Sequence, residues 1–310
     1  MKITDIFKRQ DRTFSFEFFP PKTYLGAVKF GINAGQLIKL DPSFVTVTYG
    51  AGGNTRDNTF DLVKLFHQQM GFVCMAHYTC INATEEKVAN DMRTLGDMGI
   101  ENVMLIRGDP PKGDNGKAFP NPDGFNYGTD LVRFVKNYSK YDFCIGAGAY
   151  PEKHIEASSM EEDLENLKKK VDAGADFLVT QMYFDNRYYW EFLDKTVKKG
   201  INVRIIPGII PITNFKQISK FAAMTGANIP DSIRKKMEPH QEDADAIYKL
   251  GLELAIEQSY DLLDNGAPGI HFYTLNKSRA AIDLYEALAD EFKIVRNKYK
   301  KSFTPHVPVK

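Results

Sequence analysis

Eight short apolar segments recur along the 310-residue chain, and longer segments with helical periodicity separate them. The predicted strands are residues 14–19, 44–49, 73–79, 102–107, 143–149, 177–183, 203–209 and 269–275. A doubly wound parallel sheet usually has fewer strands, whereas eight strand and helix units in a chain of this length are typical of a (β/α)8 barrel. The alternation therefore predicts an α/β fold that is a single TIM-type barrel.

The clearest helical pattern covers residues 160–173. Ser159 and Glu162 have the spacing of a capping box at its start, and Gly174 follows its end. Leu164 and Leu167 belong to a stripe of apolar residues at helical spacing. We expect such a helix to pack one face against the strands.

Two segments depart from the minimal barrel unit. The loop 108–128 is rich in Gly, Pro and Asn and is longer than an ordinary strand-to-helix connection, so it is a candidate active-site loop. An extra helical region, 230–265, precedes the last strand, and we expect it to pack outside the barrel. No linker divides the chain, so residues 1–310 are predicted to form one domain. The sequence ends soon after the last predicted strand, so we expect no C-terminal regulatory domain.

Charge and cysteine content narrow the possible functions. Lys plus Arg and Asp plus Glu number 40 each, and a net charge of zero argues against nucleic acid or a polybasic membrane surface as a partner. The three cysteines show no CxxC spacing, and the histidines are not spaced as metal ligands. No signal-length or membrane-length apolar run occurs. We therefore expect a reduced, cytoplasmic protein without a metal site.

Glu17 lies at the end of the first predicted strand, among phenylalanines. Alternation along the strand places Glu17 on the face opposite Phe14, Phe16 and Phe18. If the three aromatic rings pack against helices, Glu17 points into the barrel mouth, where the chemistry of such barrels lies. Apolar surroundings favour the protonated form of a carboxyl group, which suits a general acid. A surface carboxylate or the partner of a buried arginine is the alternative.

Other polar groups gather at the ends of the remaining strands. Arg107 is suited to hold a phosphate, although an ion pair with Asp109 at the loop corner explains both residues equally well. Gln181 offers a donor and an acceptor, which is typical of a group that reads the edge of a heterocycle, or of a polar residue that lines a barrel. Further polar groups at strand ends are Thr48, His77, Tyr150, His154, His271, Tyr273 and Thr274.

Several common catalytic motifs do not occur in the sequence. There is no GxGxxG dinucleotide fingerprint, no GxxxxGK[ST] loop and no GxSxG elbow. Once these motifs are excluded, the remaining candidates are acids, an arginine, hydroxyls and amides. They surround a wide barrel mouth that also carries aromatic residues. This set suits a flat, conjugated ligand.

Seven motifs, in order along the chain, resemble the bacterial methylenetetrahydrofolate reductases. They are FSFEFFPP (14–21), VTYGAGG (47–53), RGD (107–109), AYPE (149–152), TQ (180–181), PGIIP (207–211) and HFYTLN (271–276). Each motif alone is weak evidence for a family, but seven motifs in the same order over residues 14–276 identify it specifically. The family is a flavin-containing (β/α)8 barrel that reduces 5,10-methylenetetrahydrofolate to 5-methyltetrahydrofolate, in agreement with the strand count.

The resemblance implies catalytic and substrate-binding roles for individual residues. Glu17 matches the general acid that helps to open the folate imidazolidine ring, and Asp109 matches the carboxylate beside the flavin and the pterin. Lys277 stands where the family has an arginine. An arginine could bind a folate carboxylate through two N–H groups, whereas the lysine offers only a point charge. The residues that match the substrate side are Gln181, Gln217, Phe221, Tyr273 and Lys277.

The resemblance also implies non-covalently bound FAD. The matching positions are Thr48, His77, Arg107, Gly108, Asp109, Tyr127, Gly128, Tyr150, His154, Asp163, Asn166, Lys169 and Lys170. NADH or NADPH would deliver hydride to FAD and leave before folate binds the same face, which is a ping-pong reaction. The family also implies a homo-oligomer and a role in supplying methyl groups for methionine synthesis.

Two other functions are compatible with the sequence. A pterin-binding barrel methyltransferase would transfer a carbon unit without redox chemistry. A non-catalytic flavin-binding relative is the other alternative, but the presence of both Glu17 and Asp109 argues against it.

Overall fold

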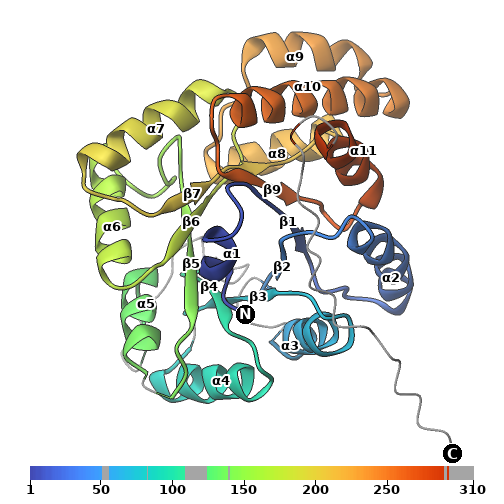
Figure 1. The fold of residues 1–310 in the computed structure, drawn as a ribbon. Coiled ribbons are helices and arrows are strands. Elements are labelled where there is room, and N and C mark those ends of the chain that lie inside the picture. Colours follow the sequence, from blue (N-terminus) through green and yellow to red (C-terminus); the bar gives the residue numbers. More distant parts are fainter. Residues whose placement is uncertain (51–55, 82, 109–123, 139, 290–291, 293–310) are drawn as a thin grey trace, which may run out of the picture.

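Parallel strands form a barrel that helices surround (Figure 1). The computed structural model describes residues 1–50, 56–81, 83–108, 124–138, 140–289 and 292. The strands are β1 (Thr13–Phe18), β2 (Phe44–Val47), β3 (Cys74–Thr79), β4 (Asn102–Ile106), β5 (Cys144–Ala149), β6 (Phe177–Thr180), β7 (Arg204–Ile206), β8 (Gly208–Ile209) and β9 (Gly269–Tyr273). Their spatial order is β7-β6-β5-β4-β3-β2-β1-β9-β8, and every pairing is parallel. The predicted barrel class is confirmed.

Helices follow most of the strands along the chain. They are α1 (Ile3–Phe7), α2 (Tyr24–Ile38), α3 (Arg56–Lys64), α4 (Glu85–Asp97), α5 (Gly128–Asn137), α6 (Met160–Asp172), α7 (Asn186–Lys198), α8 (Phe215–Thr225), α9 (Asp231–Met237), α10 (Ala244–Asp264) and α11 (Ser278–Ala289). A π-helical segment, Leu65–Gln69, extends α3, and a short 3-10 helix, Glu238–His240, follows α9. The extra helices α9 and α10 lie outside the barrel, as expected (Figure 1).

The predicted seventh strand, 203–209, is two strands in the structure. Pro207 separates β7, which pairs with β6, from β8, which pairs with β9. Proline has no backbone N–H to donate to a ladder, but the Pro207 carbonyl still accepts from the His271 N–H at 2.9 Å. The interruption thus lets one chain segment change partners and close the barrel, which is why the structure has nine strands instead of the predicted eight.

Gly208 provides space at this junction. A Cβ atom at this position would lie 2.4 Å from the Thr180 carbonyl oxygen and 2.5 Å from Tyr273 Cε2. We expect Gly208→Ala to lower the free energy of unfolding by about 2 kcal/mol, because the barrel would have to shift to relieve this overlap. Gly31→Ala is the matched control: nothing lies within 4 Å of its added Cβ, so chemical denaturation should show equal or higher stability.

The helix predicted at 160–173 is α6, which ends one residue earlier, at Asp172. The Ser159 hydroxyl accepts from the Glu162 N–H at 3.1 Å, as a capping box requires. The Glu162 carboxylate, however, accepts from the Ser158 N–H at 2.7 Å and not from Ser159. Leu164 and Leu167 are buried, so the predicted apolar face is confirmed.

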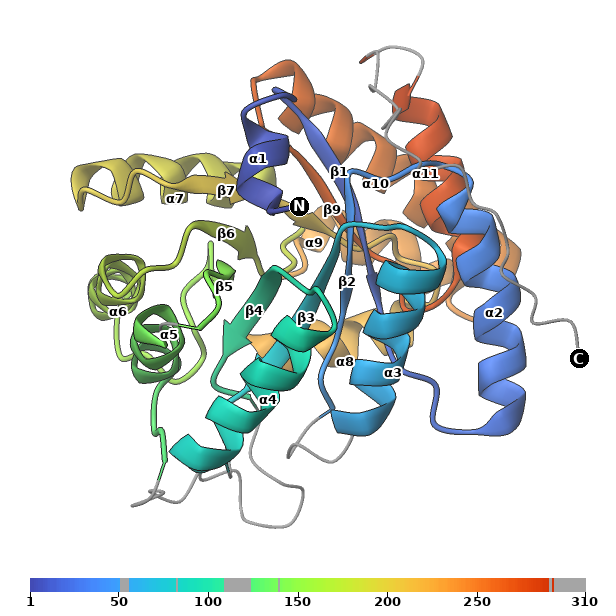
Figure 2. The same ribbon diagram turned by 60° about the horizontal axis from the view of Figure 1, so that its bottom comes forward.

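Two layers of apolar side chains hold the strands. Phe14, Phe16 and Phe18 are buried between the strands and the outer helices. Inside the barrel, Ile3 and Ile6 of α1 pack against side chains from the N-terminal parts of the strands, including Phe44. Figure 2 shows α1 at one end of the strands and α8 toward the other. Helix α1 therefore closes the N-terminal end and leaves the C-terminal end for a site.

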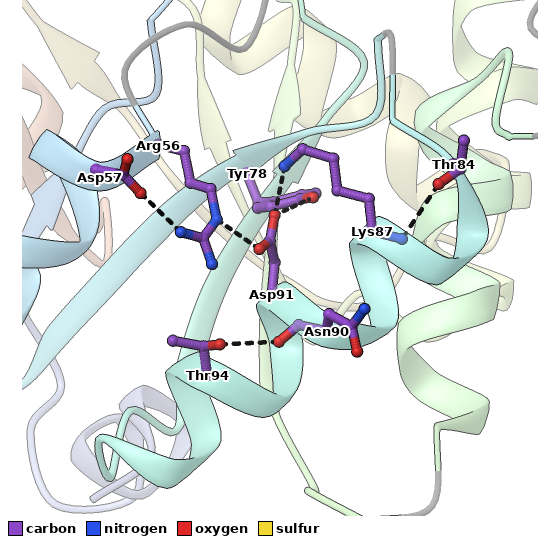
Figure 3. A network of polar contacts seen from close by, with 8 residues as sticks. All are labelled: Arg56, Asp57, Tyr78, Thr84, Lys87, Asn90, Asp91 and Thr94. Carbon is purple, nitrogen blue, oxygen red and sulfur yellow. Dashed lines mark hydrogen bonds and ion pairs between the residues drawn. The ribbon is translucent and has the colours of Figure 1, made fainter.

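A buried carboxylate fixes the start of α3. Asp91 of α4 accepts from Arg56 Nε at 2.5 Å, from the Tyr78 hydroxyl at 2.8 Å and from Lys87 Nζ at 2.6 Å (Figure 3). The Tyr78 ring also lies 5.2 Å from the Tyr49 ring, centroid to centroid. Asp91 thus joins α3, β3 and α4, and the Tyr78 ring extends this contact to Tyr49 in the loop after β2.

Candidate active site

A cavity of 590 Å³ opens at the C-terminal ends of the strands. It is lined by Glu17, Phe19, Thr48, Tyr49, His77, Met104, Ile106, Gly148, Ala149, Tyr150, Val179, Gln181, Met182, Ile210, Gln217, Phe221, Met224, Thr225, His271, Tyr273 and Leu275. Most of these residues are at the end of a strand or directly after it, and four belong to α8. The cavity therefore lies where a barrel of this class carries its chemistry.

Glu17 points into this cavity, and its side chain is only 8% exposed. Its Oε2 atom lies 3.7 Å from His77 Nε2 and 3.7 Å from His271 Nε2. The orientation follows from the alternation along β1, because the phenylalanines on the opposite face fill the layer under the helices. The carboxyl group is thus shielded from solvent, faces a ligand-sized space and has two imidazoles beside it.

His77 is neutral at neutral pH. Burial lowers the pKa of its imidazole to about 4, and the neighbouring Glu17 opposes that shift. Within the described part of the chain, His77 Nε2 has no hydrogen-bond partner. A buried polar atom without a partner is costly, so this nitrogen is suited to a polar atom of a bound molecule.

His271 is a site residue that the sequence-based assignment of roles did not include. Its side chain is 1% exposed, and its Nδ1 atom lies 2.7 Å from the Ser15 hydroxyl oxygen. The contact fixes the plane of the ring and aims Nε2 at Glu17. Because His271 and the assigned residue Tyr273 are two positions apart on β9, strand alternation could have identified it.

A polar clasp joins the ends of β1 and β9 above Glu17. The Asn276 side chain accepts from the Phe19 N–H at 2.8 Å and donates to the Phe19 carbonyl at 2.7 Å. The Thr274 hydroxyl donates to the Glu17 carbonyl at 2.6 Å. Leu275 and Asn276 both have positive φ angles, 48° and 57°, so these bonds offset a strained turn. The clasp fixes the backbone on the C-terminal side of the acid.

Four of the five residues assigned to the substrate side line the cavity: Gln181, Gln217, Phe221 and Tyr273. The Gln181 Oε1 atom accepts from the Met182 N–H at 2.9 Å, which leaves its amide NH2 group for a ligand. Lys277 is exposed and is not among the cavity residues, while its backbone N–H donates to the Thr274 carbonyl.

The residues assigned to the flavin fall into two groups. Thr48, His77 and Tyr150 line the cavity. Arg107 lies outside that lining and forms a bidentate ion pair with Glu156, with both distances 2.6 Å. Glu156 is therefore a partner of Arg107, and Asp109, the partner expected from sequence, lies outside the described residues.

The outer group continues from the loop after β5 to α6. The His154 ring packs edge-on against Tyr150 with centroids 4.6 Å apart. The backbone N–H of His154 donates to Asp163 Oδ2 at 3.0 Å. Burial raises the pKa of Asp163 and lowers the pKa of Lys170, whose Nζ lies 3.4 Å from the Gly148 carbonyl oxygen. These contacts place two of the α6 residues beside the cavity wall.

The other assigned positions are farther out. Asn166 and Lys169 are exposed on α6, and Tyr127 is exposed before the first residue of α5, Gly128. Gly108 has a φ of 89°, and a Cβ there would lie 2.8 Å from Thr79 Cβ, so this turn requires glycine.

The described residues contain neither a membrane-spanning helix nor a cluster of metal ligands. No helix there combines the length and the apolar character needed to cross a bilayer. No group of three or more His, Cys, Asp or Glu side chains there is arranged to hold a metal ion.

Comparison with known proteins identifies the family. The model of the family "Methylenetetrahydrofolate reductase" matches residues 2–289. The 5,10-methylenetetrahydrofolate reductase of Escherichia coli is 39% identical over 274 residues, which cover 88% of this chain and 90% of that protein. The methylenetetrahydrofolate reductase (NADH) 1 of Arabidopsis thaliana is 36% identical over 96% of this chain, which spans only 52% of that longer relative.

Solved structures agree in fold. An uncharacterized protein from Clostridium thermocellum, described as binding two copies of 5-methyl-5,6,7,8-tetrahydrofolic acid, has a TM-score of 0.64. It is 14% identical and covers 95% of this chain and 100% of its own, so the similarity concerns the fold alone. With the family match over nearly all described residues, the chain belongs to the methylenetetrahydrofolate reductase family.

Proposed function

We propose that this chain reduces 5,10-methylenetetrahydrofolate to 5-methyltetrahydrofolate, with non-covalently bound FAD and with NADH or NADPH as the electron donor in a ping-pong reaction. The observation that carries the proposal is the buried Glu17 carboxyl group, which faces a 590 Å³ cavity beside His77 and His271. Family membership supports the same reaction, because the bacterial relatives are named for it.

The residues around the cavity fit a flavin. A Cβ at Gly148 would meet no atom nearer than 4.0 Å, so the surface of β5 is open to a planar ring. The His77 Nε2 atom on β3, two strands along the sheet, has no hydrogen-bond partner among the described residues and offers a polar contact. We assign the ring system to Thr48, His77 and Tyr150, and the ribityl, phosphate and adenosine parts to Arg107, Gly108, Tyr127, Gly128, His154, Asp163, Asn166, Lys169 and Lys170. Asp109, outside the described residues, is assigned beside the ring.

When bound, FAD supplies the hydride that converts the methylene carbon into a methyl group. In this proposal Glu17 donates a proton to the folate nitrogen that leaves the methylene carbon, which opens the five-membered ring to a cationic iminium. Gln181 orients the pterin through its free amide group, and Phe221 and Tyr273 pack against the folate. The Asn276 clasp fixes the backbone that carries the proton donor.

The first experiment is a visible spectrum of the purified protein under anaerobic conditions. We expect flavin absorbance that bleaches when NADH is added and returns when methylenetetrahydrofolate follows, because the two half-reactions use one site in turn. A colourless protein that does not take up added FAD would contradict the proposal and favour a methyltransferase without redox chemistry.

A further inference from the structure

Helix α8 forms one wall of the cavity. Its residues Gln217, Phe221, Met224 and Thr225 all line the space that we assign to folate. The helix ends at Thr225, and its C-cap Gly226 has a φ of 78°, in the left-handed region. Whatever holds this end of α8 therefore determines the shape of the substrate wall.

The loop after β5 makes that contact through Glu152. Both carboxylate oxygens of Glu152 accept from the Asn228 N–H, at 3.2 and 3.0 Å. Beside this bond, the side chain of Ile155 lies 3.7 Å from the position of a Cβ at Gly226. Because the same loop begins with Tyr150, this contact joins the assigned flavin side of the cavity to the assigned folate side.

The carboxyl group of Glu152 has no compensating cation among the described residues. Burial, and secondarily the charge of Asp185, raise its pKa to about 7, although the Asn228 N–H opposes the shift. Asp185 is the N-cap of α7 and is itself paired with Arg187. Among the other titratable groups on the elements that meet here, Lys153 donates to the carbonyls of His154 and Ala157, and the Tyr188 hydroxyl accepts from the Asn228 side chain. Lys216 and Lys220 of α8 are exposed.

The sign of the proton dependence follows from linkage. A carboxyl group released into water has an ordinary pKa, so a raised pKa in the closed contact means that protonation favours closure. The neutral acid keeps a carbonyl oxygen that accepts from the Asn228 N–H. The ionised form keeps the same bond but carries the unfavourable burial of a charge beside another carboxylate.

We propose that Glu152 is a positioning residue that holds α8 against the loop after β5, and that its neutral form holds the helix more tightly than its ionised form. The inference rests on the proposed function, because α8 matters through the folate wall. It predicts that folate affinity falls as Glu152 ionises.

The test compares Glu152→Gln with the unmodified protein across pH 6 to pH 8. Glutamine has nearly the shape of the neutral acid and does not ionise. In the unmodified protein KM for methylenetetrahydrofolate should rise about fivefold over this range, whereas in Glu152→Gln it should stay near its low-pH value. The rate of flavin reduction at saturating NADH should be the same in both proteins. Parallel KM profiles for the two proteins would overturn the proposal.

Hydrogen exchange tests the contact without folate chemistry. In the unmodified protein the amides of residues 215–228 should exchange faster at pH 8 than at pH 6, after correction for the intrinsic rate, and Glu152→Gln should remove the difference. Glu191→Gln, an exposed carboxylate of α7, is the matched control and should behave as the unmodified protein. A pH-independent exchange in the unmodified protein would contradict the contact, whereas failure of folate reduction alone would contradict the proposed function.

Discussion

Glu17→Gln is expected to slow folate reduction by a factor of about 10²–10⁴, the usual contribution of a positioned general acid. Glutamine keeps the size of the side chain and can fill the same space between His77 and His271, but it cannot release a proton to the leaving nitrogen. Stopped-flow measurement of flavin reoxidation by methylenetetrahydrofolate gives the rate directly.

The reductive half-reaction is the internal control for this variant. Glu17 is assigned to opening of the folate ring only, so flavin reduction by NADH should continue at a similar rate in Glu17→Gln. Loss of both half-reactions would indicate that Glu17 holds the cofactor or the fold. An unchanged folate rate would remove Glu17 from the mechanism and direct attention to the neighbouring His271.

Asp91→Ala is expected to lower the free energy of unfolding by about 3 kcal/mol. Asp91 is 3% exposed and accepts from Arg56, Tyr78 and Lys87 (Figure 3). Its removal leaves the buried Tyr78 hydroxyl without this acceptor and two cations without their shared anion. Arg56 and Lys87 are partly exposed and can be hydrated again in the variant. The loss of unfolding free energy is therefore smaller than for a fully buried ion pair. Thermal unfolding should show a drop of roughly 6 °C.

The matched control is Asp172→Ala. Asp172 also pairs with a lysine, Lys168, but it is 58% exposed, and exposed pairs contribute less than about 1 kcal/mol. If the two variants lose the same unfolding free energy, the burial of Asp91 does not explain the stability that its network contributes. Because Tyr78 packs on the cavity residue Tyr49, Asp91→Ala should also weaken flavin retention, measured as absorbance that remains after gel filtration.

The order of strands and helices was predictable from local periodicity. All eight predicted strand segments contain strands, and α6 begins where its cap and acidic first turn placed it. The inward direction of Glu17 was predictable for the same reason, since neighbouring residues on a strand alternate between its faces. Strand ends were less accurate: β2 ends at Val47 and β6 at Thr180, so Tyr49 and Gln181 lie just beyond the ladders.

Contacts between distant segments were not predictable in the same way. The sequence offered Asp109 as one possible partner of Arg107, and Asp109 lies outside the described residues. The structure pairs Arg107 with Glu156, which lies on the loop after the next strand and which no local pattern pointed to. His271 reaches Ser15 across 256 residues of sequence, and Asp91 meets Arg56 across 35. No spacing rule along the chain encodes such pairs.

The sequence by itself determined the succession of barrel units, the apolar faces of the helices and the side of β1 on which Glu17 lies, because each depends on a period of a few residues. Only the tertiary structure showed that the strand breaks at Pro207 and that two imidazoles lie 3.7 Å from Glu17. It also showed that Glu152 accepts from the Asn228 N–H beyond the end of α8. These features exist only after the barrel closes, since closure brings the ends of non-adjacent segments to one mouth and sets which polar groups are buried together.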